Sequence, residues 1–273
     1  MAGSVSQHRV FCWSTPRSLS TAFMKCLGTI DGSVAWLEPY GTAEHFGPDG
    51  LLKPPGEIPP EPEYTHAWIK DKLEEDFQGR QAVIIKDLAY AVMGRLQYLP
   101  KGYRHSFLIR QPTKSFMSYY RLFKKMSGDG EGDASLRGWL PQKGFSYGEL
   151  AEMADYVEKE LGQQLVIVDA DDILNHPGAM VQKYCSALGL PFSESILTWE
   201  PGMPSNWIVP KSVREAEEEF HWMTTVLESR CFNKGHQKPS NEATGEIPEI
   251  VKEMVAVAQP YYDKLHARRI LPS

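Results

Sequence analysis

A loop rich in hydroxyl side chains, residues 14–21, holds one arginine, Arg17. The apolar run before it, residues 10–13, predicts a strand, and the residues after Ser20 follow a helical pattern. A strand, a loop and a helix N-terminus form an anion site, because backbone N–H groups and the helix dipole both attract negative charge. Arg17 adds a fixed cation to this loop. We therefore predict that the loop binds a phosphate or sulfate group.

Two later segments add a second set of cations. Arg110 and Pro112 follow another predicted strand, and Ser118 stands eight residues after Arg110. Near the C-terminal end, the sequence Phe-Asn-Lys-Gly contributes Lys234 and Gly235. One anion loop indicates one phosphate, whereas two separated clusters indicate a nucleotide that carries phosphates at two ends.

The first loop is not a Walker A motif. That motif needs Gly-Lys-Ser/Thr, with the Lys on the β- and γ-phosphates and the hydroxyl on Mg²⁺. Here Arg17 precedes the hydroxyls, and no Gly-Lys-Ser/Thr follows a predicted strand. An ATPase or GTPase is therefore disfavoured, and a kinase-like P-loop transferase that uses ATP is kept only as an alternative.

The three segments together resemble the motifs of sulfotransferases that use 3′-phosphoadenosine 5′-phosphosulfate (PAPS). That family opens with Pro-Lys/Arg-Ser-Gly-Ser/Thr-Thr, which residues 16–21 match at all but one position. Its Arg-x-Pro motif with a following Ser matches Arg110 and Ser118, and its Phe-Arg-Lys-Gly loop resembles residues 232–235. The resemblance runs from about residue 8 to about residue 268. It implies a P-loop-like α/β fold, PAPS as donor, PAP as product and no required metal.

The resemblance also implies a role for each matching residue. Arg17 is the cation at the bridging oxygen of the transferring group. The donor-binding residues that it implies are Ser18, Leu19, Ser20 and Thr21 for the 5′-phosphate, and Arg110, Ser118, Lys234 and the amide of Gly235 for the 3′-phosphate.

Two positions depart from the family pattern. Leu19 replaces a Gly that permits positive φ and close approach of the backbone. We therefore expect either a negative φ at Leu19 or a phosphate held slightly farther away. Asn233 replaces an Arg and removes one cation from the 3′-phosphate. These departures leave a catalytically silent module that binds PAP or another nucleotide as a second alternative.

An acceptor hydroxyl or amine also needs a base. The phenol and steroid enzymes of the family use a His two residues after a Lys that ends the third strand. Here Lys86 is followed by Asp87 and a Leu, so that His is absent. A bacterial branch acting on sugar hydroxyls uses a Glu at the end of the second strand, where this chain has Glu38. Glu38 is therefore our candidate base, and the substitutes are His45, His66 and Asp87.

The acceptor is expected to be a small molecule, and its identity does not follow from the sequence. Aromatic residues near the second strand and in a Pro-rich segment, residues 200–211, are candidates for its pocket. The candidate acceptor-binding residues are Trp36, Tyr40, Phe46 and Trp207.

Composition sets the remaining limits. The chain has 273 residues, 42% hydrophobic and 23% charged, which is typical of a globular protein. Its net charge of −6 disfavours nucleic acid as a partner. No run approaches the ~20 apolar residues of a membrane span, and residues 1–9 lack the apolar core of a signal peptide. Four cysteines without metal or disulfide spacing favour a cytoplasmic location, and the oligomeric state is left open.

Alternating strand and helix patterns predict one doubly wound α/β domain over residues 1–273, with a central parallel sheet flanked by helices. The predicted strands are residues 9–13, 33–37, 82–86, 106–109 and 165–168. The predicted helices are residues 21–26, 64–77, 113–126, 147–161, 178–188, 213–227 and 249–265. Flexible loops are expected at about residues 41–63 and 127–143, where Pro and Gly gather.

Overall fold

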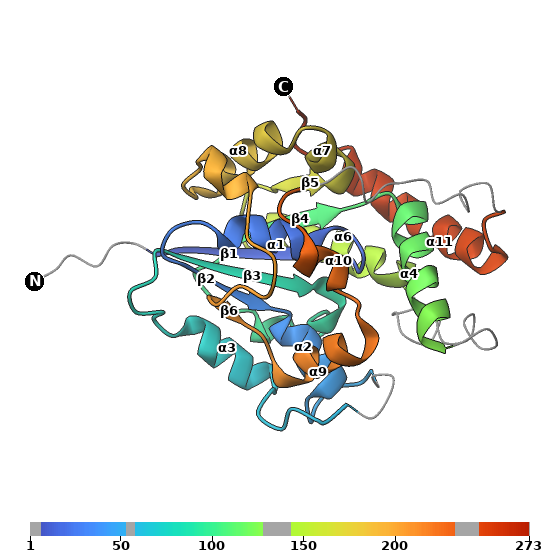
Figure 1. The fold of residues 1–273 in the computed structure, drawn as a ribbon, viewed down its shortest axis with the longest axis horizontal. Coiled ribbons are helices and arrows are strands. Elements are labelled where there is room, and N and C mark those ends of the chain that lie inside the picture. Colours follow the sequence, from blue (N-terminus) through green and yellow to red (C-terminus); the bar gives the residue numbers. More distant parts are fainter. Residues whose placement is uncertain (1–6, 53–57, 128–142, 233–245, 273) are drawn as a thin grey trace, which may run out of the picture.

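The computed structural model describes residues 7–52, 58–127, 143–232 and 246–272. A six-stranded parallel sheet lies at the centre, with strand order β5-β4-β1-β3-β2-β6 (Figure 1). Because β1 lies between β3 and β4, the chain winds outward from β1 in both directions, as in doubly wound folds. The strands are β1 (His8–Ser14), β2 (Ser33–Leu37), β3 (Ala82–Leu88), β4 (Arg104–Ile109), β5 (Ile167–Asp169) and β6 (Trp207–Ile208).

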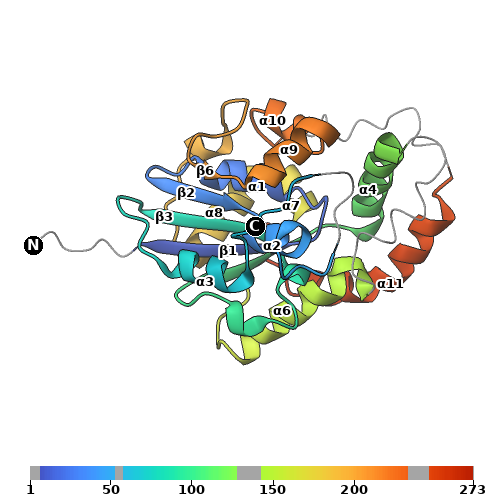
Figure 2. The same ribbon diagram turned by 90° about the horizontal axis from the view of Figure 1, so that it is seen from below.

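Helices cover both faces of this sheet (Figures 1 and 2). One face packs on α1 (Ser20–Gly28), α7 (Ala170–Asn175), α8 (Pro177–Leu188), α9 (Lys211–Phe220) and α10 (Thr224–Glu228). The other face packs on α2 (Pro39–Phe46), α3 (His66–Glu74), α4 (Pro112–Ser127), α6 (Tyr147–Lys159) and α11 (Glu249–His266). Short 3₁₀ turns occur at Ala89–Ala91, Leu96–Tyr98, Gly144–Ser146 and Glu194–Leu197.

The central strands are apolar on both sides because both sides are covered. Val10 and Cys12 of β1 belong to the core beneath α1 and α8. Phe11 and Trp13, which alternate with them, belong to the core on the opposite face. Successive side chains of a strand point to opposite faces, so a sheet covered twice needs nearly continuous apolar runs.

The register brings the predicted site segments to one edge of the sheet. Trp13 of β1 lies opposite Asp87 of β3, and Leu37 of β2 lies opposite Lys86. Since these strands are parallel, the loop after β1 and the residue after β2 both emerge at the carboxyl edge. Ligands of doubly wound folds bind beyond this edge.

The fold class and the first five strands are confirmed, and the differences lie in short elements. β6 has only two residues, too few to show an alternating pattern, and was not predicted. The predicted helix 213–227 is broken into α9 and α10, because His221 adopts a left-handed φ of 54°. α2 begins at Pro39, so a helix occupies the start of the expected loop 41–63. Most of the expected loop 127–143 lies outside the described residues.

Among the residues that the structure describes, no helix combines the length and the apolar character that a membrane span requires.

Candidate functional site

The loop after β1 adopts left-handed backbone at two non-glycine residues. Arg17 has a φ of 62° and Leu19, the N-cap of α1, has a φ of 74°. Of the two expected consequences of Leu19, the negative φ is wrong, because Leu19 takes the conformation that a Gly would take. The other, a phosphate held slightly farther away, stays a prediction. Left-handed backbone costs an L-residue roughly 1–2 kcal/mol. Such turns direct successive N–H groups toward one point, where an anion can sit.

Several residues at this edge of the sheet have a strained, left-handed backbone conformation. The described non-glycine residues with positive φ are Arg17, Leu19, Glu38, Phe145, Ser146 and His221. Arg17, Leu19 and Glu38 are among the predicted site residues. Backbone strain persists where the surrounding structure enforces it, and it gathers at functional sites.

Substitutions at Leu19 isolate the strain of this loop. Leu19→Ala and Leu19→Gly both remove the side chain that packs on the core beneath α1. Only Gly also relieves the left-handed φ of 74°. We expect the free energy of unfolding of Leu19→Gly to be about 1 kcal/mol higher than that of Leu19→Ala. Urea denaturation of both variants measures the difference, and equal stabilities would show that this φ is not strained in solution.

The Arg17 side chain reaches two other elements. Its Nε donates to Ser118 Oγ of α4 at 3.1 Å, and its Nη1 donates to the carbonyl of Trp222 at 2.8 Å. Burial, and then the neighbouring Arg110 guanidinium, lowers the pKa of Arg17. An arginine stays charged in proteins all the same. The structure therefore holds a poorly solvated cation at the mouth of the loop.

Arg110, just after β4, supports the same loop. Its Nη1 donates to the Arg17 carbonyl at 2.9 Å, while Tyr147 donates its hydroxyl to the Arg110 carbonyl at 2.7 Å. Two buried atoms, Arg110 Nε and Thr15 Oγ1, have no hydrogen-bond partner among the described residues. Buried polar atoms without partners are uncommon and fit a site built for a polar ligand. Phosphate oxygens can accept from both.

The remaining donor residues fall into separate groups. Ser18 is buried, and its hydroxyl donates to the Thr15 carbonyl at 2.7 Å. This hydrogen bond closes the loop on itself, and the contact of Ser18 with a phosphate stays a prediction. Ser20 and Thr21 open α1, where N–H groups of the first turn have no partner inside the helix. The predicted residues Asn233, Lys234 and Gly235 lie outside the described residues.

Glu38 lies across β3 from the loop. It is the N-cap of α2, with a left-handed φ of 48°, and its N–H donates to the Lys86 carbonyl at 2.7 Å. Its carboxylate forms an ion pair with the Lys86 ammonium, whose side chain is only 3% exposed against 27% for Glu38. Glu38 thus keeps part of its side chain exposed.

Tyr119 of α4 lies within electrostatic reach of both Arg17 and Glu38. Burial raises the pKa of its phenol, the Arg17 charge opposes this rise, and the Glu38 charge adds to it. The pKa of Tyr90 is raised well above its usual value, mainly by burial, then by the neighbouring Tyr119 and by the Glu38 charge. Two buried phenols that stay protonated therefore lie near the predicted base, and one of them also lies near the predicted cation.

The alternative bases are engaged elsewhere. His66 is buried, with Nε2 at 2.7 Å from the Ala91 carbonyl and Nδ1 at 2.9 Å from Arg95 Nη1. His45 Nε2 lies 2.9 Å from the Tyr90 hydroxyl, and burial lowers the pKa of His45 to about 4. The ring nitrogens named here are therefore engaged in hydrogen bonds inside the protein.

Asp87, the third alternative, uses both of its carboxylate oxygens to accept from backbone N–H groups. Burial, and then the Glu38 charge, raises the pKa of Asp87 to about 7, although the N–H donors oppose the rise. The side chain has no solvent exposure and therefore no open face toward an acceptor. This geometry favours Glu38 over Asp87 as the base.

The predicted acceptor residues Trp36, Tyr40 and Trp207 are buried in the two main cores, and their contact with an acceptor stays a prediction. Phe46 belongs to a small cluster at the side of α2, against which Trp222 also packs. Because the Arg17 guanidinium holds the Trp222 carbonyl, Trp222 lies between Phe46 and the donor loop. One signal for Trp222 was present in the sequence, namely an aromatic residue after a run of glutamates inside a predicted helix.

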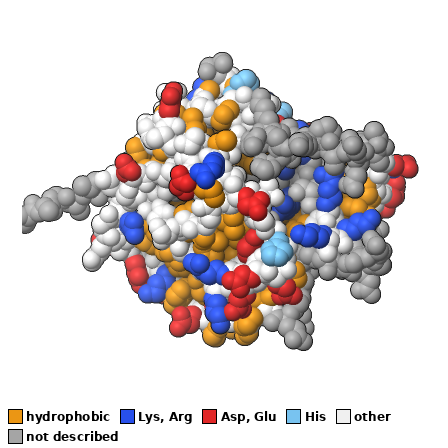
Figure 3. Space-filling model, in the orientation of Figure 1, with side chains coloured by type: hydrophobic (Ala, Val, Ile, Leu, Met, Phe, Trp, Pro, Cys, Tyr) orange, Lys and Arg blue, Asp and Glu red, His pale blue; other side chains and the backbone are white. Residues whose placement is uncertain are grey.

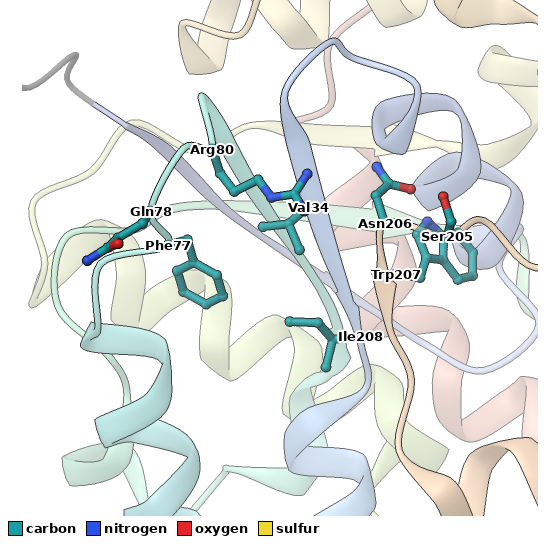
Figure 4. A pocket seen from close by; sticks show the side chains of 8 residues that line it. All are labelled: Val34, Phe77, Gln78, Arg80, Ser205, Asn206, Trp207 and Ile208. Carbon is teal, nitrogen blue, oxygen red and sulfur yellow. The ribbon is translucent and has the colours of Figure 1, made fainter.

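The pocket shown in Figure 4 lies at the opposite edge of the sheet. Its lining residues include Val34 near the start of β2, Arg80 before β3 and Trp207 of β6. Its volume is about 280 Å³. None of the predicted donor residues lines it, so Trp207 contributes to a different surface from the one expected.

Basic side chains gather over α4, beside the donor loop (Figure 3). The exposed ones on this helix are Lys114, Arg121, Lys124 and Lys125. Lys114 pairs with Asp171 at 2.8 Å. An acidic chain thus carries a local basic region next to the predicted anion site, which favours the approach of an anionic donor.

Comparison with known proteins adds three findings. Residues 148–269 match the family model of the sulfotransferase domain. A curated relative, the branched-chain-amino-acid aminotransferase-like protein 2 of Arabidopsis thaliana, is 25% identical over 209 residues. That match covers 71% of this chain but 32% of the relative, so the chain spans about a third of the relative's length.

Solved structures share the fold at low sequence identity. The sulfotransferase domain from the curacin biosynthetic pathway is 13% identical, with a TM-score of 0.51, and the match covers 97% of this chain and 99% of that domain. The mouse sulfotransferase SULT7A1 complexed with PAP is 12% identical, with a TM-score of 0.53, and the match covers 92% and 83%. Residues 148–269 thus resemble a sulfotransferase domain in sequence, and nearly the whole chain shares the fold of solved sulfotransferases.

Proposed function

We propose that this protein transfers a sulfuryl group from PAPS to a hydroxyl or amine of a small molecule. One observation carries the proposal: the left-handed loop holds the Arg17 cation on one side of β3, while Glu38 opens toward the same edge from the other side. The Arg17 cation stabilises the negative charge that develops on the leaving phosphate, and the Glu38 carboxylate accepts the proton that the acceptor loses. The similarity to sulfotransferases supports the reaction class, and the geometry of the site supports the proposed roles.

The donor site is the loop together with Arg110. The N–H groups at the start of α1 and the Arg17 guanidinium face the 5′-phosphosulfate. Arg110 Nε, Thr15 Oγ1 and the Ser118 hydroxyl supply further polar contacts, with Arg110 and Ser118 directed to the 3′-phosphate. Lys234 and Gly235 remain part of this proposal for the 3′-phosphate.

The chemistry is an in-line displacement at sulfur. A bond forms between the acceptor oxygen or nitrogen and sulfur, and the bond from sulfur to the bridging oxygen of the 5′-phosphate breaks. The electron pair of that bond goes to the leaving phosphate, beside Arg17, while the acceptor proton goes to Glu38. Catalysis by positioning and charge is typical of the related phosphoryl transfer. Fixed donors in a poorly solvated site stabilise developing charge strongly.

Beside Glu38, we assign Tyr90, Tyr119 and Trp222 as candidate contacts of the acceptor, because they lie near Glu38 or Arg17. The mouse sulfotransferase of the same fold forms a complex with PAP, which supports the same nucleotide here. Free thiols at Cys12, Cys26, Cys185 and Cys231 support the proposed cytoplasmic location.

A ligand panel tests the proposal. PAP at about one hundred times its dissociation constant should stabilise the protein by roughly 2.7 kcal/mol, which is a rise in Tm of at least about 5 °C. The rise should persist in EDTA, because Arg17 and the loop amides do the work that Mg²⁺ does in P-loop NTPases. ATP with Mg²⁺ should give a smaller shift. Stabilisation by ATP with Mg²⁺ but not by PAP would overturn the proposed donor.

The Arg110→Ala variant tests whether Arg110 binds the 3′-phosphate. Loss of a charge-assisted contact costs ~1.5–3 kcal/mol, so PAP affinity should fall roughly tenfold to a hundredfold. Because Arg110 also holds the Arg17 carbonyl, 5′-AMP should weaken slightly. Arg104→Ala, at the far end of the same strand, is the matched control and should leave both affinities unchanged. Equal losses for PAP and 5′-AMP would contradict the assignment of Arg110 to the 3′-phosphate.

A further inference from the structure

Asp87 makes an unusual set of contacts for a residue inside a strand. Its Oδ2 accepts the Tyr40 N–H at 2.6 Å, and its Oδ1 accepts the Gly41 N–H at 2.9 Å and the Leu88 N–H at 2.8 Å. The side chain is fully buried. Two of these donors belong to the first turn of α2, which is a different element from β3.

α2 lacks a cap of its own. Its N-cap residue, Glu38, makes no side-chain capping bond, and Pro39 has no N–H to satisfy. The next two N–H groups, from Tyr40 and Gly41, are those that an N-cap side chain normally accepts. Asp87 accepts both, so the cap of α2 comes from the neighbouring strand.

Gly41 makes this approach possible. A Cβ at this position would lie 3.3 Å from Asp87 Oδ1 and 3.3 Å from Glu38 Cβ. The first turn of α2 is therefore packed tightly between the capping carboxylate and the Glu38 side chain.

Two neighbouring residues of β3 thus hold Glu38 from two sides. Lys86 holds its carboxylate through the ion pair, and the Lys86 carbonyl accepts the Glu38 N–H. Asp87 holds the backbone of the helix that Glu38 begins. Since Glu38 has a left-handed φ of 48°, it needs such restraint to keep this conformation.

We infer that Asp87 is a positioning residue: it caps α2 from β3 and thereby fixes Glu38 at the distance and angle that proton transfer needs. This inference rests on the proposed function of Glu38. It gives Asp87 a role in turnover without contact with the acceptor. The role requires a carboxylate, because an Asn amide would turn an NH₂ group toward one of the N–H donors.

The test compares Asp87→Asn with Asp172→Asn. Asp172 of α7 is a partly buried carboxylate that accepts from Arg269 Nε at 2.7 Å and touches none of the proposed site residues, so its loss controls for general destabilisation. In Asp87→Asn we expect amide hydrogen exchange of residues 40–46 to rise at least about tenfold. Exchange in α1 and PAP affinity should stay within about threefold, while kcat falls at least about tenfold at unchanged KM for PAPS.

The inference is overturned if residues 40–46 exchange as slowly in Asp87→Asn as in the control, or if kcat falls equally in both. If Asp87→Asn does not fold, the Gly41→Ala variant serves as the test. An Ala at this position favours the helix, but its Cβ crowds Asp87 and Glu38. We then expect unchanged or higher Tm with lower kcat, and full kcat would refute the inference. Failure of wild-type protein to use PAPS would refute the proposed function alone, because the exchange data report on the cap independently.

Discussion

The Glu38→Gln variant should lose transfer activity by ~10²–10⁴-fold, the usual cost of removing a general base. Its affinity for PAP should stay within a few fold, because Glu38 contacts the acceptor side of the site and not the donor loop. A base that acts only in the transition state lowers kcat and leaves ground-state binding intact. Single-turnover transfer from labelled PAPS, with an acceptor found by screening hydroxylated and amine metabolites, measures the effect.

The control is Glu44→Gln, in the same helix. Glu44 is also largely buried and also faces a cation, with Arg95 Nη1 at 3.9 Å from its carboxylate. It contacts no residue of the donor loop, so its variant should keep at least a tenth of the activity. Full turnover by Glu38→Gln would place the base elsewhere.

The ion pair between Glu38 and Lys86 offers a different explanation for the loss of activity in Glu38→Gln. If Glu38 served only to neutralise Lys86, removing both charges would restore activity. We expect the double variant Glu38→Gln with Lys86→Met to fold about as well as wild type, since it leaves no unpaired buried charge. It should remain as inactive as Glu38→Gln. Recovery of turnover in the double variant would assign Glu38 a structural role.

The strand, loop and helix of the proposed donor site could be predicted from the sequence because they depend on local order. A hydroxyl-rich loop between strand and helix places Arg17 and the α1 amides together whatever surrounds them. Even the departure at Leu19 was visible as a conflict between residue type and backbone. What the sequence did not show was the outcome, that the fold enforces the left-handed φ at Leu19.

The acceptor side could not be predicted in the same way. Trp36 and Tyr40 lie next to Glu38 in the sequence, yet the sheet is covered on both faces and buries them in the core. Trp222, by contrast, is brought to the loop by a break between α9 and α10 that a helical pattern does not reveal. The capping role of Asp87 was equally hidden, because its partners, the amides of α2, come from a helix that the sequence did not predict.

Replacing Arg17 by Met is expected to reduce turnover by ~10²–10³-fold, comparable to the loss of one donor that stabilises developing charge. The effect should fall on kcat and also on donor affinity, because the guanidinium faces the group that transfers. Arg17→Lys keeps the charge, so it should retain most PAP affinity and a larger share of turnover. It still cannot reproduce two directed bonds in the same geometry.

Those two bonds explain why Arg17 should matter beyond its charge. The guanidinium joins Ser118 of α4 to the carbonyl of Trp222 between α9 and α10. Loss of the side chain therefore also releases Trp222 from the loop, and acceptor KM should rise in Arg17→Met but less in Arg17→Lys. Arg95→Met, another half-buried arginine away from the loop, is the control. Normal turnover of PAPS by Arg17→Met would show that Arg17 does not stabilise the charge on the leaving oxygen.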